Sequence, residues 1–173
     1  LAREIARRFN KKFGQTFKEP KVFLPKIGEK IMSLQNPKKK MSKTDDSKGC
    51  IGLFDPPEEI QKKILSATTD SGKQIKYSLS QKPGISNLLT IYSLFAKKEI
   101  PQIEKEFKNK GYAEFKKALS QLLINKLETF RRKKKELESR EVYVKEILEQ
   151  GAKKARVIAQ STMAEVRKKM GIS

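Results

Sequence analysis

Apolar residues recur every three or four positions over long stretches of the second half of the chain. This spacing places the apolar side chains on one face of an amphipathic helix. The face over residues 115–137 consists of Phe115, Leu119, Leu122, Leu123, Leu127, Phe130 and Leu137. The face over residues 144–166 consists of Val144, Leu148, Gly151, Ala155, Ile158, Thr162 and Val166. The pattern predicts two long helices that belong to a helical bundle and bury these faces in its core.

Turn and cap residues divide the rest of the chain into shorter elements. An opening amphipathic helix is predicted to end at Gly14. Asp55, followed by two prolines and a glutamate, predicts a helix that has Asp55 as its N-cap and runs to about Ser66. Two further helices are predicted over about residues 85–97 and 101–111, because each follows a proline signal. The fold class is therefore expected to be mostly α.

Two short apolar runs have the appearance of strands. Residues 21–24 lie between prolines, and residues 31–34 alternate before an Asn-Pro turn signal. The polar residues 38–49 follow, and they show no periodicity. We expect strands at the two runs and an exposed, mobile loop after the second.

The charge balance indicates the class of partner. The chain has 173 residues, with 40 Lys and Arg against 20 Asp and Glu, so its formal net charge is +20. Such a basic chain predicts a polyanionic partner, and nucleic acid is the commonest one. The chain has no histidine, which excludes Ser-His-Asp and Cys-His catalytic sites and histidine-ligated metal sites.

Targeting signals are weak in this sequence. The single cysteine, Cys50, has no partner for an internal disulfide. No signal peptide and no apolar run long enough to cross a bilayer is evident, so we expect a cytoplasmic protein that does not enter the membrane. The opening segment is basic and amphipathic like a mitochondrial presequence, but it contains Glu4 and lacks serine. It also begins without an N-cap, which predicts that this is the downstream part of a longer chain.

Residues 40–44 carry the clearest chemical signal. Lys40 and Lys43 are three positions apart, with the Ser42 hydroxyl between them, and they follow a strand-like run. Two ammonium groups and a hydroxyl at this spacing suit the binding of polyphosphate oxygens. A lysine-rich run on its own is more often a solvated surface.

The sequence KMSKT over residues 40–44 resembles the KMSKS signature of class I aminoacyl-tRNA synthetases, with threonine at the last position. Other blocks, in the same order along the chain, resemble the tryptophanyl-tRNA synthetases. These blocks are residues 31–34, 67–72, 82–89, 91–93, 110–112 and 149–155. Several separated blocks are more specific than one short motif, and the similarity covers essentially the whole chain.

The resemblance implies a ligase that activates tryptophan with ATP, releases pyrophosphate, and transfers tryptophan to tRNA(Trp). ATP with Mg²⁺ is then a substrate, and no protein-bound metal is expected. Lys40 and Lys43 would be catalytic residues that hold the leaving pyrophosphate, an electrostatic task. The implied ATP-binding residues are Ile31, Lys40, Met41, Ser42, Lys43 and Thr44.

The resemblance also implies a domain division. The family's other signature, HIGH, contains two histidines and is absent here, so this chain is expected to lack the half that binds most of the tryptophan and to be inactive alone. Residues 1–48 would be the C-terminal end of a Rossmann-type α/β domain, and residues 49–173 a helical tRNA-binding domain. The intact enzyme would be a homodimer.

Basic residues on the two long helices are candidates for contact with tRNA phosphates. They are Arg131, Arg132, Lys133, Lys153 and Lys154. Nearby glutamates leave open the alternative of a solvated, locally paired surface. Two other functions also stay open at this point: a tyrosyl-tRNA synthetase, and a non-catalytic basic RNA-binding helical module.

Overall fold

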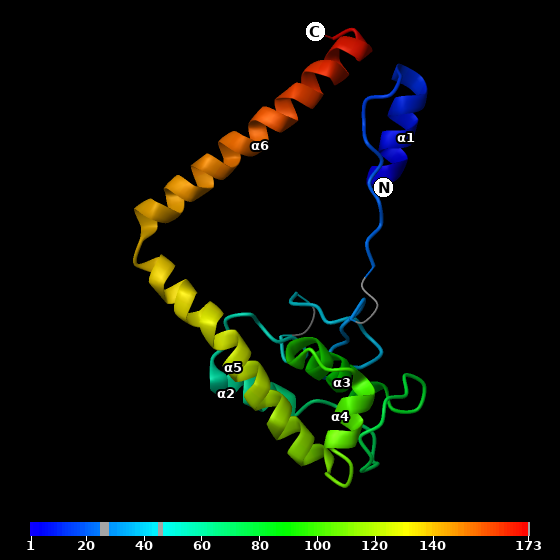
Figure 1. The fold of residues 1–173 in the computed structure, drawn as a ribbon, viewed down its shortest axis with the longest axis vertical. Helices are drawn as coiled ribbons and strands as arrows, with labels where there is room; N and C mark the ends of the chain where they lie inside the picture. Colours follow the sequence, from blue (N-terminus) through cyan, green and yellow to red (C-terminus); the bar gives the residue numbers. More distant parts are fainter. Residues whose placement is uncertain (25–27, 45–46, 173) are drawn as a thin grey trace. The chain divides into compact units, whose positions relative to one another are not determined.

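The computed structural model describes residues 1–24, 28–44 and 47–172. Within these ranges the chain forms helices and no strand, which confirms the mostly α prediction (Figure 1). The helices are α1 (Ala2–Phe13), α2 (Pro57–Leu65), α3 (Pro83–Ala96), α4 (Ile100–Glu106), α5 (Tyr112–Glu138) and α6 (Glu141–Met170). The chain divides into two compact units, one formed by Leu1–Phe23 with Glu136–Ser173 and the other by Leu24–Lys135.

Helix α3 forms the centre of the unit Leu24–Lys135. Ten consecutive residues of α3, from Gly84 to Ser93, are buried; none of them is charged, and the polar ones among them are small or hydrogen-bonded within the unit. Helices α2, α4 and the first half of α5 contribute fully buried side chains to the same core, among them Ile60, Ile103 and Phe115. The core of this unit is therefore built by helix packing, as the periodicity of residues 115–127 indicates.

Close packing at the start of α3 depends on a glycine. A Cβ atom at Gly84 would collide with the backbone carbonyl of Thr68. The absence of a side chain therefore lets the N-terminus of α3 lie directly against the turn that follows α2. Thr68 in that turn also bonds the backbone of Leu34 and Gln35, so the fit at Gly84 influences the position of the candidate site.

The unit formed by the two ends of the chain contains α1 and α6. Gly14, at a φ of 83°, ends α1 as predicted. The Asn10 side chain then organises the next turn, because its Oδ1 accepts hydrogen bonds from the backbone amides of Thr16 and Phe17. Lys169 near the end of α6 donates to the Gln15 carbonyl and to Thr16 Oγ1, both at 2.8 Å. These contacts hold the two ends of the chain together within this unit.

The strand predictions for residues 21–24 and 31–34 are wrong in the part of the chain that the structure describes. Residues 21–24 have no regular secondary structure and are exposed, and in residues 31–34 Met32 forms an isolated β-bridge with Lys40. A strand requires a neighbouring strand along its length, and the described residues offer none. In place of a ladder, the backbone around Met32 pairs with a side chain of α3.

The assignment of Asp55 as an N-cap is also wrong. Helix α2 begins at Pro57 after Pro56. The Asp55 carboxylate accepts a hydrogen bond from the Gly52 amide at 2.9 Å and forms an ion pair with Lys63 at 2.6 Å. Burial by itself raises the pKa of Asp55, but the hydrogen bonds from Lys63 and Gly52 outweigh it and hold that pKa below its usual value.

The apolar face of α6 does not form a core among the described residues. Leu148 is 66% exposed and Ile158 is 73% exposed, and Val166 is the residue of this face that is buried. Phe130 on α5 is also half exposed, although the spacing places it in the core. Periodicity identifies the face that favours burial, but it does not determine what covers it. No described helix has the length and apolarity that a membrane crossing requires.

Candidate functional site

The candidate site is the loop at residues 40–44, which directly follows a tight turn of the chain. The Met41 amide donates to the Ile31 carbonyl at 2.9 Å, and the Ser33 amide donates to the Lys39 carbonyl at 2.8 Å. These two bonds join the segments on either side of the turn. The start of the loop is therefore fixed by the backbone of residues 31–33.

The buried side chain of Asn87 holds this turn against α3. Its Oδ1 accepts a hydrogen bond from the Met32 amide at 2.8 Å, and its Nδ2 donates to the Met32 carbonyl at 2.7 Å. Asn87 is 5% exposed and lies among apolar neighbours on α3. One side chain therefore pairs with both backbone groups of the residue that bridges to Lys40.

A second anchor holds the same segment two residues further on. The Leu34 amide donates to the Gly49 carbonyl at 2.9 Å, and the Leu34 carbonyl accepts from the Thr68 amide at 2.7 Å. The Thr68 hydroxyl donates to the Gln35 carbonyl at 2.8 Å. Leu34 itself is buried in the core. Helix α3 and the turn after α2 thus position the loop from two sides.

The side chains of the loop divide into an exposed and a half-buried set. Lys40, Lys43 and Thr44 are exposed. The Ser42 and Thr44 hydroxyls lie 3.1 Å apart. Met41 is half-buried and packs against the core. The two lysines form no ion pair with any carboxylate that the structure describes, and Asp45 and Asp46 lie outside the described residues. The loop therefore presents two ammonium groups and two hydroxyls to solvent from a fixed base.

An apolar hollow of about 250 Å³ lies beside the loop. Met41 and Ile31 form part of its wall, with Ile51, Leu94 and Phe95. Ile31 and Met41 were assigned to ATP from the sequence, and the structure brings their side chains to one surface. Cationic groups next to an apolar surface suit a ligand that has a charged end and a flat apolar part.

A polar cluster away from the loop ties three sequence blocks together. Lys82 at the start of α3 forms an ion pair with Asp70 at 3.0 Å and donates to the Tyr112 hydroxyl at 2.9 Å. The Tyr112 hydroxyl lies 2.8 Å from the Asp70 carboxylate, to which it donates. The cluster joins the turn after α2 to the first residues of α3 and α5.

The protonation states of this cluster follow from its contacts. Burial by itself raises the pKa of Asp70, but hydrogen bonds from Lys82, Tyr112 and the Gly72 amide outweigh it and lower that pKa. Hydrogen bonds with Tyr112 and Asp70 raise the pKa of Lys82. Burial raises the pKa of Tyr112. At neutral pH the cluster is therefore a carboxylate, an ammonium and a neutral phenol.

The residues assigned to tRNA from the sequence have different surroundings. Arg131 is 13% exposed on its side chain, donates to the Ile124 carbonyl at 2.7 Å and pairs with Glu128. Arg132 and Lys133 on α5 are exposed, as are Lys153 and Lys154 on α6. The Arg131 guanidinium also donates to the Asp55 carbonyl at 3.4 Å, so its contacts join α5 to the segment before α2. The two pairs on α5 and α6 belong to different units of the chain.

Sequence reasoning did not assign a role to Asn87 or Thr68, although both lie in the blocks that carry the family resemblance. A signal for Asn87 was present, because an amide within an otherwise apolar helix segment must find hydrogen-bond partners when it is buried. The partner of Thr68 was not readable, because Leu34 and Gln35 lie more than thirty positions away.

Comparisons with known proteins identify the family of the chain. The family model described as tRNA synthetases class I (W and Y) matches residues 1–128, a range that includes the loop, Asn87 and the polar cluster. The tryptophan–tRNA ligase of Caldanaerobacter subterraneus is 43% identical over 173 residues, which is 99% of this chain and 52% of that ligase. The Listeria innocua ligase is 46% identical over 174 residues, with the same coverage of 99% and 52%.

Solved structures give the same relation. Tryptophanyl-tRNA synthetase from Mycoplasma pneumoniae superposes with a TM-score of 0.88 at 32% identity, over 99% of this chain and 52% of that one. The Campylobacter jejuni synthetase complexed with ADP and tryptophan superposes with a TM-score of 0.65 at 28% identity, over 98% and 52%. The chain thus spans about half the length of these relatives. Because the family model covers most of the chain, from residue 1 to 128, this chain belongs to the class I tRNA synthetases of the W and Y family.

Proposed function

We propose that this chain is the C-terminal portion of a tryptophan–tRNA ligase. The complete enzyme would join tryptophan to ATP as tryptophanyl-adenylate, release pyrophosphate, and esterify tryptophan to tRNA(Trp). The family model covers the tryptophan and tyrosine enzymes alike. Relatives that are 42–46% identical over essentially the whole chain are named as tryptophan–tRNA ligases, which favours tryptophan over tyrosine.

The loop at residues 40–44 would act on the triphosphate of ATP. Adenylate formation needs no protein nucleophile, because the carboxylate of the amino acid attacks the α-phosphorus and pyrophosphate leaves. The protein must position both substrates and stabilise the charge that develops on the leaving phosphates. The ammonium groups of Lys40 and Lys43 would supply positive charge opposite the negative charge of the leaving phosphates. The hydroxyls of Ser42 and Thr44 would donate hydrogen bonds to the phosphate oxygens. Mg²⁺ would enter with ATP as part of the substrate.

The observation that carries this proposal is the contrast between the base of the loop and its tip. The base is held by backbone hydrogen bonds and by the buried Asn87, whereas Lys40 and Lys43 are exposed. Catalytic groups must be held on a rigid support while they remain accessible to substrate. A merely solvated lysine run has no need of a buried amide that pairs with the adjoining backbone.

The proposal also assigns a role to each domain of the chain. Residues 1–48 would be the C-terminal end of the Rossmann-type domain, and residues 49–173 the helical domain that binds tRNA. The other half of the protein would supply the HIGH signature and most of the tryptophan pocket, and the intact enzyme would be a cytoplasmic homodimer. The 173 residues alone would then form no adenylate.

The test is ATP–pyrophosphate exchange with Lys43→Ala in the full-length protein that contains this segment. Lys38→Ala is the matched control, because Lys38 is an exposed lysine of the same run outside the motif. We expect Lys43→Ala to raise the barrier of adenylate formation by about 2–4 kcal/mol, with a smaller effect on the KM for ATP. Equal rates for Lys43→Ala and Lys38→Ala would refute the role of the loop.

A further inference from the structure

Lys116 is a half-buried lysine of α5 that the mechanism above does not use. Its ammonium group donates hydrogen bonds to the carbonyl of Ala67 at 2.7 Å and to the carbonyl of Leu65 at 3.2 Å. Both acceptors lie at the C-terminal end of α2, where carbonyls lack partners within the helix and the helix dipole favours a positive charge. Lys116 therefore caps α2 from a different helix.

The environment of Lys116 disfavours its charge. Burial lowers the pKa of the ammonium group. Within the described part of the chain its hydrogen bonds go to two neutral carbonyls, and no carboxylate pairs with it. The next residue, Lys117, is exposed, so a solvated lysine and a half-buried one stand side by side on α5. The burial of Lys116 calls for a reason, and the segment that it holds supplies one.

The residue after Ala67 connects this cap to the candidate loop. The amide of Thr68 donates to the Leu34 carbonyl at 2.7 Å, and its hydroxyl donates to the Gln35 carbonyl at 2.8 Å. The amide of the residue before Leu34 donates in turn to the Lys39 carbonyl at 2.8 Å. Lys39 directly precedes the motif. A continuous series of backbone contacts therefore leads from the end of α2 to the start of the loop.

Tyr112 supports the same turn from the same face of α5. It lies four positions before Lys116, a spacing that puts both side chains on one face of the helix. Its hydroxyl donates to the Asp70 carboxylate at 2.8 Å. Thr68 therefore lies between two points of contact with α5, the Ala67 carbonyl on one side and Asp70 on the other.

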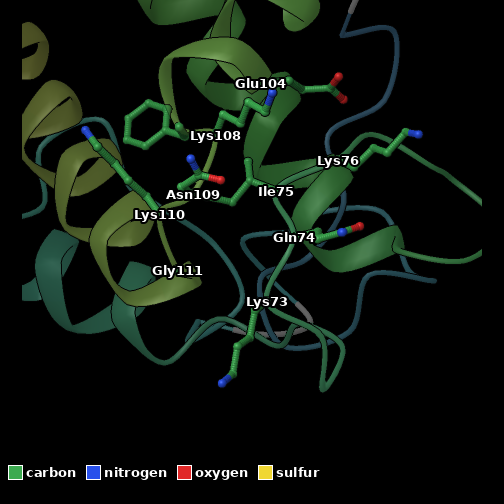
Figure 2. Close-up of a pocket in the computed structure, with 10 residues that line it drawn as sticks. Lys73, Gln74, Ile75, Lys76, Glu104, Lys108, Asn109, Lys110 and Gly111 are labelled. Carbon is green, nitrogen blue, oxygen red and sulfur yellow. The ribbon is translucent and has the colours of Figure 1, made fainter.

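The start of α5 is itself held by its neighbours. Figure 2 shows the segment 73–76 and the turn 107–111 that leads into α5, which line one hollow. The Tyr112 hydroxyl lies 3.1 Å from the Gln74 carbonyl, and Phe115, the residue before Lys116, is fully buried in the core. The first turns of α5 are thus a fixed support from which Lys116 can hold the end of α2.

We propose that Lys116 is a positioning residue for the loop at residues 40–44. By capping α2 it fixes the turn that carries Thr68, and Thr68 holds the backbone from which Lys40 and Lys43 reach the triphosphate of ATP. Lys116 acts through the loop and is not itself a catalytic residue. The inference rests on the proposed function, because it names a further support of the same site.

The first test is the steady-state kinetics of ATP–pyrophosphate exchange by the full-length protein carrying Lys116→Met. Methionine is similar in length to lysine, but it cannot donate to the two carbonyls. We expect kcat to fall about tenfold or more while the KM for ATP changes by less than about twofold, because a displaced catalytic group slows the chemical step. Lys117→Met removes one charge from the exposed neighbour and should exchange at the unmodified rate. An unchanged kcat in Lys116→Met would overturn the proposal.

The second test separates positioning from a loss of stability. If Lys116 acts through Lys43, Lys116→Met should lower kcat by a smaller factor in protein that already carries Lys43→Ala, because the group that it positions is gone. A variant that only reduces the fraction of folded protein lowers the rate by the same factor in both backgrounds. Ile103→Val, which removes a buried methyl group from α4, is the control for that behaviour. Equal factors for Lys116→Met in both backgrounds would overturn the proposal.

Thr68→Val tests the next contact in the series and leaves the cap on α2 intact, so it decides the question even where Lys116→Met does not fold. The substitution removes the hydroxyl that bonds the Gln35 carbonyl and preserves the shape of the side chain. We expect the same pattern, a lower kcat with little change in the KM for ATP and a smaller effect beside Lys43→Ala. Exchange at the full rate would overturn the role of this turn.

The same measurements distinguish this inference from the proposed function. A lowered rate in Lys43→Ala together with a normal rate in Lys116→Met and Thr68→Val would overturn the positioning role alone. Exchange at the full rate in Lys43→Ala would refute the role of the loop, and with it both proposals.

Discussion

Replacement of Asn87 by leucine tests whether the candidate loop depends on its anchor in α3. Leucine is similar in shape to asparagine, but it lacks both polar atoms of the amide. The substitution therefore removes the hydrogen bonds of 2.8 and 2.7 Å to the Met32 amide and carbonyl while it preserves most of the packing. The backbone of Met32 then loses its two partners within α3.

The expected magnitude follows from those two bonds. A polar group left without its partner in a buried position costs about 1–3 kcal/mol. Met32 is half-buried, so solvent recovers part of this cost. We expect the free energy of unfolding to fall by about 2–4 kcal/mol in total. Because the Met41 amide bonds the Ile31 carbonyl next to Met32, the change should also displace Lys40 and Lys43.

Urea unfolding of the chain measures the stability effect, and Thr90→Val is the matched control. Thr90 is a buried residue of the same helix, and its hydroxyl bonds the Ser86 carbonyl within that helix, so its loss frees no group of the loop. In the full-length enzyme, Asn87→Leu should lower kcat of ATP–pyrophosphate exchange more than it raises the KM for ATP. The reasoning is refuted if Asn87→Leu is no more destabilising than Thr90→Val.

Four further predictions concern the supports of the fold. Tyr112→Phe should lower the free energy of unfolding by about 1–2 kcal/mol in urea titrations, because the Asp70 carboxylate loses a hydrogen bond. The lowered pKa of Asp70 means that its stabilisation is complete above the ordinary value of 3.8 and is lost as the pH falls below it. The raised pKa of Lys82 means that its stabilisation is complete below 10.5 and is lost as the pH rises above it. Unfolding measured against pH should show both losses, and Asp70→Asn should reduce the acidic one, leaving the part that comes from Asp55. Lys116→Met should cost about 1–2 kcal/mol, measured by urea unfolding, since Lys116 donates to two carbonyls at the end of α2. Arg131→Met should destabilise by about 1–2 kcal/mol yet leave tRNA affinity in filter binding unchanged, because the Arg131 guanidinium is engaged by α5 itself.

The helices were predictable because local signals and tertiary packing agree for most of them. Gly14 ends α1 as a glycine after the last turn should, and the stripe over residues 115–127 faces the core. The apolar face of α6 shows the limit of this reasoning, because residues such as Ile158 remain exposed. The strand predictions were wrong for a related reason. Residues 21–24 have strand-like composition, but a β-ladder depends on a partner strand that the local sequence does not specify.

The candidate site was predictable in its chemistry but not in its support. The motif at residues 40–44 identified the exposed lysines and hydroxyls directly. Its anchors come from Asn87 and Thr68, which lie far along the chain and act through hydrogen bonds to backbone groups. A backbone group carries no sequence signature, so these contacts become visible in the folded chain. Arg131 shows the converse, because its place in a basic run did not reveal that its guanidinium is nearly buried.

The most direct test of the account is ATP–pyrophosphate exchange by the full-length protein with tryptophan, with tyrosine and with no amino acid, alongside the same protein carrying Lys40→Ala/Lys43→Ala. We predict exchange with tryptophan alone, and loss of that exchange in the double variant. Exchange with tyrosine would assign the chain to the sister enzyme of the family. Exchange that survives loss of both lysines, or no exchange with either amino acid, would contradict the assignment of the loop and favour a basic RNA-binding module.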